Sequence, residues 1–167
     1  MSDQPEVRDG ETVLSFDPSE RVDATIRFIG RIHTPWKRGD CPKNVTRARE
    51  TGEGAHVQLE SGFAEGLRGL SVGDGIMLMY WMHSARRDLM TQRPRNHAVA
   101  RGTFSLRSPN RPNPIALAAV RITALNLDTG RIEIDAIDCF DGTPLVDIKP
   151  SAPAVDVPPE IETPAER

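Results

Sequence analysis

Apolar and polar residues alternate over short stretches in the middle of the chain, a period of two that is typical of β-strands with one buried face. Val57 and Leu59, for example, alternate with three polar residues between positions 56 and 60. Turn-forming residues separate most of these stretches from one another. The sequence therefore predicts strands at 25–33, 56–60, 75–82, 99–106, 115–125 and 132–136.

Two of these stretches have patterns of their own. Residues 75–82 are apolar almost throughout, which predicts a strand buried on both faces. Residues 115–125 contain an alanine-rich run with good helix propensity, so a strand and a helix both fit them. The DTG turn at 128–130 predicts a hairpin between this stretch and the strand that follows it.

Helical spacing is sparse, and it is convincing only in residues 63–70, where two glycines keep the predicted helix short. Five or six strands with so little helix predict a mainly all-β fold, a small β-barrel, closed or half open, with short helical connections. We expect this barrel domain to span residues 24–150. Residues 1–23 are predicted to form a loosely held acidic arm, and residues 151–167 a proline-rich acidic tail.

Composition narrows the cellular setting. The longest apolar run, 76–82, has seven residues, whereas a membrane-spanning helix needs about 20. The acidic N-terminus shows no apolar core of a secretory signal. Two cysteines, Cys41 and Cys139, are too few for a disulfide scaffold in a chain of 167 residues. We therefore expect a cytoplasmic protein without membrane contact.

The net charge of −3 conceals an uneven distribution. Residues 1–23 hold seven acids and two bases, whereas residues 24–150 hold 18 bases and 13 acids. Seven arginines lie within residues 86–111 alone. Because the planar arginine fork suits phosphate and carboxylate, this run fits a surface for an anionic ligand or nucleic acid. An ordinary solvated charged surface fits it equally well.

The sequence has none of the common motif spacings of nucleotide-binding loops, hydrolases or metal sites, so no metal site is expected. Two stretches are nevertheless rich in polar residues and in prolines that restrict the backbone. Residues 107–114 (RSPNRPNP) contain three prolines, which predict a stiff, extended ribbon that presents its side chains in fixed directions. A proline-rich surface connector is the alternative. Residues 138–150 (DCFDGTPLVDIKP) carry three aspartates and a lysine, which fit either an ordinary hairpin or a charged set at the mouth of the barrel.

Five blocks, taken together and in order, give a family resemblance. They are IGRIHTP (29–35), GLRGL (66–70), LMYWMH (78–83), RSPNRPNPI (107–115) and DCFDGTPLVDIKP (138–150). In these blocks the chain resembles the TsaA-like family of tRNA adenine N6-methyltransferases, which are β-barrel proteins that use S-adenosylmethionine. One departure is the segment PKN at 42–44, where family members usually have Pro-Arg-Gln.

The resemblance implies a set of site residues. The positions that correspond to S-adenosylmethionine binding are Lys43, Asn44, His83, Ser84, Arg107, Leu117, Ile137 and Asp138. Those that correspond to the substrate mouth are Arg111, Asn113 and Lys149. The acceptor amine loses a proton during methyl transfer, and either Asp138 or Asp141 would accept it as the catalytic base.

The resemblance also implies a homodimer of barrels and methyl transfer to N6 of threonylcarbamoyladenosine at tRNA position 37. Residues 86–111 would then hold phosphates of the anticodon loop. Two other functions fit the same residues: S-adenosylmethionine-dependent methylation of a substrate other than tRNA, and a cofactor-sensing or interaction module. In each case we expect the ribbon and residues 138–150 to converge and enclose the cofactor.

Overall fold

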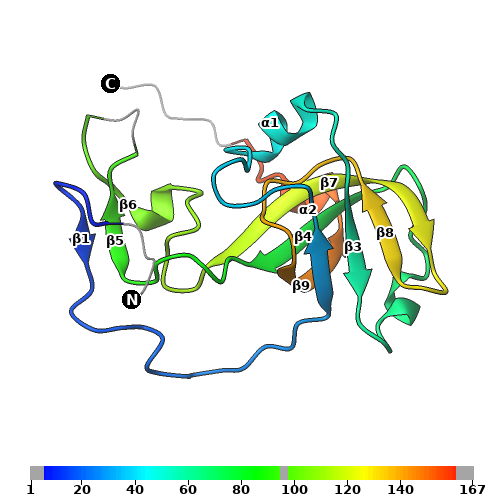
Figure 1. Cartoon of the computed structure of the whole chain (residues 1–167), viewed down its shortest axis with the longest axis horizontal. Coiled ribbons are helices and arrows are strands. Elements are labelled where there is room, and N and C mark those ends of the chain that lie inside the picture. Colours follow the sequence, from blue (N-terminus) through cyan, green and yellow to red (C-terminus); the bar gives the residue numbers. More distant parts are fainter. Residues whose placement is uncertain (1–5, 95–97, 161–167) are drawn as a thin grey trace.

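The computed structural model describes residues 6–94 and 98–160, and its main element is a closed barrel of six antiparallel strands (Figure 1). Around the barrel the strands follow the order β2, β3, β8, β7, β4 and β9, and β9 closes it by pairing with β2. Their bounds are Gly30–His33 (β2), Ala55–Leu59 (β3), Gly75–Trp81 (β4), Ile115–Asn126 (β7), Arg131–Ile134 (β8) and Thr143–Pro150 (β9). The predicted mainly all-β barrel with short helical connections is confirmed, and the barrel is closed.

A second, three-stranded sheet lies beside the barrel (Figure 1). It consists of β1 (Thr12–Val13), β5 (Leu89–Gln92) and β6 (Arg101–Gly102), in that order. The helices are short: α1 (Val45–Glu50), α2 (Pro153–Asp156) and two 3-10 helices, Ala64–Leu67 and Thr103–Ser105. In the described parts of the chain, no helix has the length and hydropathy needed to cross a membrane.

Period-two alternation fills the barrel core. In β4, Ile76, Leu78 and Tyr80 point inward and are buried, whereas Met77 and Met79 point outward and are half-buried. The expectation of a strand buried on both faces is therefore wrong for the outer face of β4, which other parts of the chain cover only partly. The largest buried apolar side chains of the core are Ile32, Val57, Ile76, Leu78, Ile122, Ile132, Ile134, Ile137 and Leu145.

The ambiguous stretch at 115–125 forms strand β7, which pairs with β4 on one side and β8 on the other. Pairing on both sides satisfies its backbone groups, and this tertiary gain outweighs the helix propensity of its alanines. The predicted hairpin to β8 is present, and Gly130 in its turn has a positive φ of 65°. A Cβ at Gly130 would lie 3.2 Å from the Leu59 side chain, so glycine also allows the close approach of β3.

Two predicted strands are shorter than expected. Strand β2 covers only the last four residues of 25–33. Of residues 99–106, only β6 is a strand, and the 3-10 helix at Thr103–Ser105 follows it directly. The reason is the buried Thr103 hydroxyl, which donates a hydrogen bond to the Leu89 carbonyl oxygen (2.8 Å) and turns the chain back onto β5.

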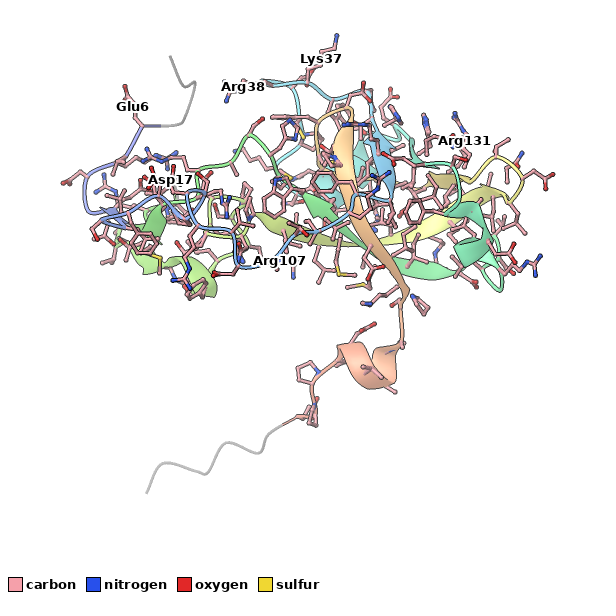
Figure 2. All side chains as sticks on the ribbon, turned by 90° about the horizontal axis from the view of Figure 1, so that it is seen from below. Glu6, Asp17, Lys37, Arg38, Arg107 and Arg131 are labelled. Carbon is pink, nitrogen blue, oxygen red and sulfur yellow. The ribbon has the colours of Figure 1, made fainter. Side chains whose placement is uncertain are left out.

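The N-terminal arm was expected to be loosely held, but part of it joins the small sheet. Strand β1 pairs with β5, and the Leu14 amide donates a hydrogen bond to the Asp88 carbonyl oxygen (2.7 Å). At the other end of the chain, α2 follows β9 and projects away from the barrel (Figure 2). The boundaries of the predicted regions, 1–23, 24–150 and 151–167, remain predictions.

Candidate functional site

The proline-rich ribbon at 107–114 has no regular secondary structure and is held by side chains. The Arg111 guanidinium donates hydrogen bonds to the carbonyl oxygens of Leu106 and Ser108. The side-chain amide of Gln92 donates a hydrogen bond to the backbone carbonyl oxygen of Asn110 (2.6 Å). The ribbon is therefore braced from within and from β5, in addition to the φ restriction of its prolines.

Two cavities border this ribbon and share Pro109 and Asn110 in their walls. The first cavity has a volume of about 230 Å³, and its remaining walls come mainly from the end of β4 and the turn before β9. The predicted cofactor residues His83 and Ser84 line it, together with Phe140. The ribbon and the 138–150 stretch thus meet at one cavity, as expected from the sequence.

The second cavity is larger, with a volume of about 420 Å³. Two more of the predicted cofactor residues, Lys43 and Arg107, line it. Arg107 lies near the junction of the small sheet and the barrel (Figure 2). The N-terminal arm also contributes to its wall and supplies Arg8 and Glu11.

Asp138 interacts with Tyr80 of β4 and is affected by the charge of Arg107, the first residue of the ribbon. The Tyr80 hydroxyl donates a long hydrogen bond to Asp138 Oδ1 (3.5 Å), and the charge of Arg107 is close enough to favour the carboxylate form. Burial outweighs both effects and raises the pKa of Asp138 above its ordinary value. Arg107 in turn donates a hydrogen bond to the Leu117 carbonyl oxygen (2.7 Å). Arg107 therefore links three predicted cofactor residues, by its contact with the Leu117 carbonyl oxygen and by the effect of its charge on Asp138, although neither Leu117 nor Asp138 lines either cavity.

Asp141 has different partners from Asp138. Its Oδ1 accepts hydrogen bonds from the Thr34 amide (3.2 Å) and contacts His33 Nδ1 (3.1 Å), and the His33 ring stacks on His56 with 4.9 Å between centroids. These contacts attach Asp141 to the end of β2 and the outer side of β3. The two candidate bases are thus in separate surroundings, and only Asp138 has Arg107 and Tyr80 beside it.

The candidates for the substrate mouth do not line either cavity. Arg111 is engaged within the ribbon, and Asn113 Oδ1 lies 3.5 Å from Arg87 Nη2. Lys149 forms an ion pair with Asp147 (2.9 Å). It lies six residues beyond Thr143 along β9, which is about 20 Å at the usual rise of a strand. Arg111 and Asn113 therefore lie on the ribbon without lining either cavity, and the structure does not bring Lys149 to the ribbon.

Two further cofactor candidates have clear structural contacts of their own. Asn44 caps α1, since its side-chain oxygen accepts a hydrogen bond from the Arg47 amide (2.9 Å). Ile137 is buried, and its carbonyl oxygen accepts a hydrogen bond from Trp36 Nε1 (3.0 Å). Trp36 thereby fixes the loop between β2 and α1, which carries Lys43, against the segment between β8 and β9 that carries Asp138. In the described ranges, no group of three or more ligand-type side chains is arranged to hold a metal ion.

Sequence reasoning missed several residues around Asp138. Tyr80 was visible only as an apolar strand residue, and burial together with the Asp138 charge raises the pKa of its hydroxyl. Cys41 lies near the same group, and burial with the charges of Asp138 and Asp40 raises its pKa to about 11. The Trp36 anchor also went unnoticed. Its one sequence signal was an aromatic residue in an otherwise polar loop.

The arginine-rich segment proves to be largely structural. Arg86 pairs with Asp88 (2.7 Å), and Arg87 donates a hydrogen bond to the Pro112 carbonyl oxygen while its guanidinium lies 5.6 Å from the centre of the Trp81 ring. With Arg107 and Arg111, most of these guanidinium groups hold the chain's own carbonyl, carboxylate or aromatic groups. Arg95 lies outside the described residues. Arginine clustering along the sequence therefore does not by itself mark a basic surface for phosphates.

Comparison with known proteins gives consistent matches over the barrel. Residues 31–157 match the family described as tRNA-methyltransferase O N-terminal domain. VirR of Rhizobium radiobacter, a probable S-adenosyl-L-methionine-binding protein, is 36% identical over 132 residues, which cover 78% of this chain and 73% of VirR. An S-adenosyl-L-methionine-binding protein of Archaeoglobus fulgidus is 33% identical over 138 residues, which cover 82% of this chain and 96% of that protein.

Solved structures show the same barrel. A crystal structure of TrmO superimposes with a TM-score of 0.66 at 27% identity, covering 86% of this chain and 64% of that one. TrmO from P. aeruginosa gives a TM-score of 0.61 at 26% identity, covering 81% of this chain. This chain spans only about six-tenths of the length of these solved proteins. The chain belongs to the tRNA-methyltransferase O N-terminal domain family, the TsaA-like family that its five blocks resemble.

Proposed function

We propose that the protein is an S-adenosylmethionine-dependent methyltransferase that methylates N6 of threonylcarbamoyladenosine at position 37 of tRNA. Family membership and the names of the relatives support the cofactor and the reaction class. The observation that carries the proposal is the position of Arg107, which lines the second cavity, donates to the Leu117 carbonyl oxygen and acts through its charge on Asp138. A cytoplasmic location, where tRNA is found, is part of the same proposal.

The residues around the ribbon fit the chemistry of S-adenosylmethionine. The cofactor has a carboxylate, for which Arg107 and Lys43 at the second cavity supply donors. It also has an adenosyl group, for which Met82 and Phe140 supply apolar walls in the first cavity, with His83 and Ser84 as polar neighbours. We therefore propose that Arg107 and Lys43 bind the charged end, and that residues of the first cavity bind the adenosyl end.

When bound, S-adenosylmethionine would supply a methyl carbon that the acceptor nitrogen attacks in line, with the neutral thioether of S-adenosylhomocysteine as the leaving group. The chain's contribution is to orient the acceptor and to receive its proton. Asp138 suits the second task because burial raises its pKa toward the range in which a carboxylate is a useful base. The fixed contact between Arg107 and the Leu117 carbonyl oxygen keeps the cation beside Asp138 in one orientation.

A homodimer is part of the proposal, and the outer face of β4 and β7 supports it. Met79 lies directly opposite Leu117, and Trp81 opposite Ile115, so apolar side chains are adjacent on the outside of the barrel. Ile115 is 42% exposed and Leu117 is 39% exposed. An apolar patch of this kind is typical of a protein-protein interface, and a two-fold contact there would put the Arg107 cluster next to the second subunit.

Replacing Ile115 with glutamate is expected to give a monomer, because a charge in an apolar two-fold interface is buried twice, once from each subunit. Analytical ultracentrifugation measures the oligomeric state of wild type and variant at the same concentration. The matched control is Thr123→Glu, which adds the same charge at an exposed position of the same strand. A dimer that survives Ile115→Glu as well as Thr123→Glu would show that this face is not the interface.

A second function remains a candidate because of a specific observation. Arg111, Asn113 and Lys149, the residues expected at the substrate mouth, do not line the cavities. This favours the alternatives in which the protein binds S-adenosylmethionine but methylates a substrate other than tRNA, or serves as a sensing or interaction module. The cofactor site is common to all three functions.

One experiment separates the tRNA methyltransferase from the two alternatives. Purified protein is incubated with S-adenosylmethionine carrying a labelled methyl group and with tRNA that contains or lacks threonylcarbamoyladenosine. We expect label only in the modified tRNA, with mass analysis locating the methyl group on its N6. Cofactor binding without label in either tRNA would refute the tRNA assignment and leave the alternatives.

A further inference from the structure

The N-terminal arm forms one wall of the second cavity. Glu6, Arg8 and Glu11 line this cavity together with Lys43 and Arg107. The arm precedes residues 31–157, the part of the chain that matches the family. Its contribution to the cavity is therefore a property of this chain that the family match does not cover.

The arm is attached to β5 by several hydrogen bonds. The backbone amide of Thr12 donates a hydrogen bond to Thr91 Oγ1 (2.7 Å), and the hydroxyl oxygens of the two threonines are 2.8 Å apart. The Arg8 guanidinium donates to the Arg93 carbonyl oxygen (3.0 Å), and Arg93 lies 3.5 Å from the Asp9 carboxylate. Attachment on both sides of Glu11 sets the position of the arm over the cavity.

Glu11 fastens the arm at the cavity itself. Its Oε1 accepts a hydrogen bond from the Arg93 amide (2.8 Å) and its Oε2 accepts one from the Arg8 amide (2.9 Å). Partial burial acts to raise the pKa of Glu11, but these two hydrogen bonds and the charges of Arg8 and Arg86 lower it overall. Glu11 is therefore a carboxylate at neutral pH whose oxygens are already engaged by backbone donors.

The remaining charge at the cavity is mainly positive. Four basic side chains line it, Arg8, Lys43, Arg93 and Arg107, against Glu6 and the engaged Glu11. Arginine forks and a lysine ammonium in the wall of one cavity suit a carboxylate or a phosphate group. Arg8 is the member of this set that lies on the arm.

We infer that the N-terminal arm is a built part of the ligand site, in which Glu11 positions the arm and Arg8 supplies an additional anion-binding side chain. The anion is a carboxylate or a phosphate, and its two sources would be the methionyl group of the cofactor and the backbone of the RNA. The identity of the ligand rests on the proposed function, whereas the anion site does not.

The test uses the full chain and two pairs of matched variants. Arg8→Ala is compared with Arg21→Ala, an arginine that is exposed elsewhere on the arm and paired with Asp23. Glu11→Ala is compared with Glu20→Ala, which makes the same charge change away from the cavity. Three probes are used on every protein: inorganic sulfate, by its effect on the melting temperature, S-adenosylhomocysteine, by calorimetry, and a tRNA transcript, by binding at several salt concentrations.

We expect sulfate to stabilise Arg8→Ala and Glu11→Ala less than it stabilises the two control variants. If the anion belongs to the cofactor, both variants bind S-adenosylhomocysteine about tenfold more weakly, since a lost hydrogen bond to a charged group costs about 1.5 kcal/mol. If it belongs to the RNA, the salt dependence of tRNA binding becomes shallower by about one phosphate contact.

Variants that match their controls with all three probes would overturn the inference. Failure of the proposed function has a different signature. In that case wild-type protein binds no S-adenosylhomocysteine and transfers no methyl group, while the sulfate difference between Arg8→Ala and Arg21→Ala persists. Circular dichroism of each variant establishes that the barrel is folded.

Discussion

Replacing Asp138 with asparagine is expected to reduce the rate of methyl transfer by about 100- to 10,000-fold, the usual contribution of a positioned general base. The neutral amide keeps the size of the side chain but does not accept the proton of the acceptor amine. Cofactor affinity, measured by calorimetry, should change far less than the rate. Single-turnover transfer of a labelled methyl group to modified tRNA measures the effect.

The control for this variant is Asp141→Asn, which removes the charge that faces His33 and Thr34. We expect it to retain most of the activity, because Asp141 is attached to β2 and not to the Arg107 cluster. Loss of activity in Asp141→Asn together with full activity in Asp138→Asn would identify Asp141 as the base. The sequence alone allowed either residue.

Asp138 is expected to support activity but to lower the free energy of unfolding at neutral pH. Because burial raises its pKa above the ordinary 3.8, the folded protein binds a proton at Asp138 more readily than the unfolded chain does. The free energy of unfolding therefore decreases as pH rises from about 3.8 through the raised pKa. Asp138→Asn removes this penalty, so urea denaturation at neutral pH should show a variant that is more stable than wild type.

Replacing Arg107 with alanine is expected to weaken cofactor binding by about 10- to 100-fold, because hydrogen bonds to charged groups contribute about 1.5–3 kcal/mol. Arg107→Lys should give a smaller loss, since it keeps the charge but not the fork that donates to the Leu117 carbonyl oxygen. Calorimetry with S-adenosylhomocysteine measures both variants.

Arg107→Ala also has an expected effect on the pH dependence of the reaction. The positive charge of Arg107 lowers the pKa of Asp138, so its removal should shift the acidic limb of the rate profile to higher pH. A purely structural role of Arg107 would not move this limb. The control is Arg101→Ala, an exposed arginine on β6 in the same arginine-rich segment. Unchanged cofactor affinity in Arg107→Ala would remove this residue from the site.

The strands with clear alternation were predictable because their pattern reflects a local property, one face toward the core and one toward solvent. Strands β3 and β8 were found in this way, whereas β4 was found from its continuous apolar run. Residues 99–106 were assigned wrongly because the position of Thr103 depends on a hydrogen bond to Leu89, fourteen residues earlier in the chain. Such a contact has no periodic signal.

The site residues were predictable only through the family resemblance, and the structure places some of them at the cavities but not others. The charge of Arg107 acts on Asp138, and His83 lines the first cavity. Lys149 belongs to the same sequence block as Asp138, but the regular rise of β9 carries it about 20 Å from Thr143. Proximity in sequence and a shared motif therefore did not place a residue at the ribbon.

The amino-acid sequence by itself determined that this is a small β-barrel protein with a stiff ribbon, because alternation and proline act over a few neighbouring residues. Only the tertiary structure decided which charges remain available to a ligand. Most arginines of 86–111 are occupied by the chain's own carbonyl and carboxylate groups, and the acidic arm closes a basic cavity. The physical reason is that a guanidinium group bonds whichever acceptor the fold places within reach, and that acceptor is usually distant in sequence.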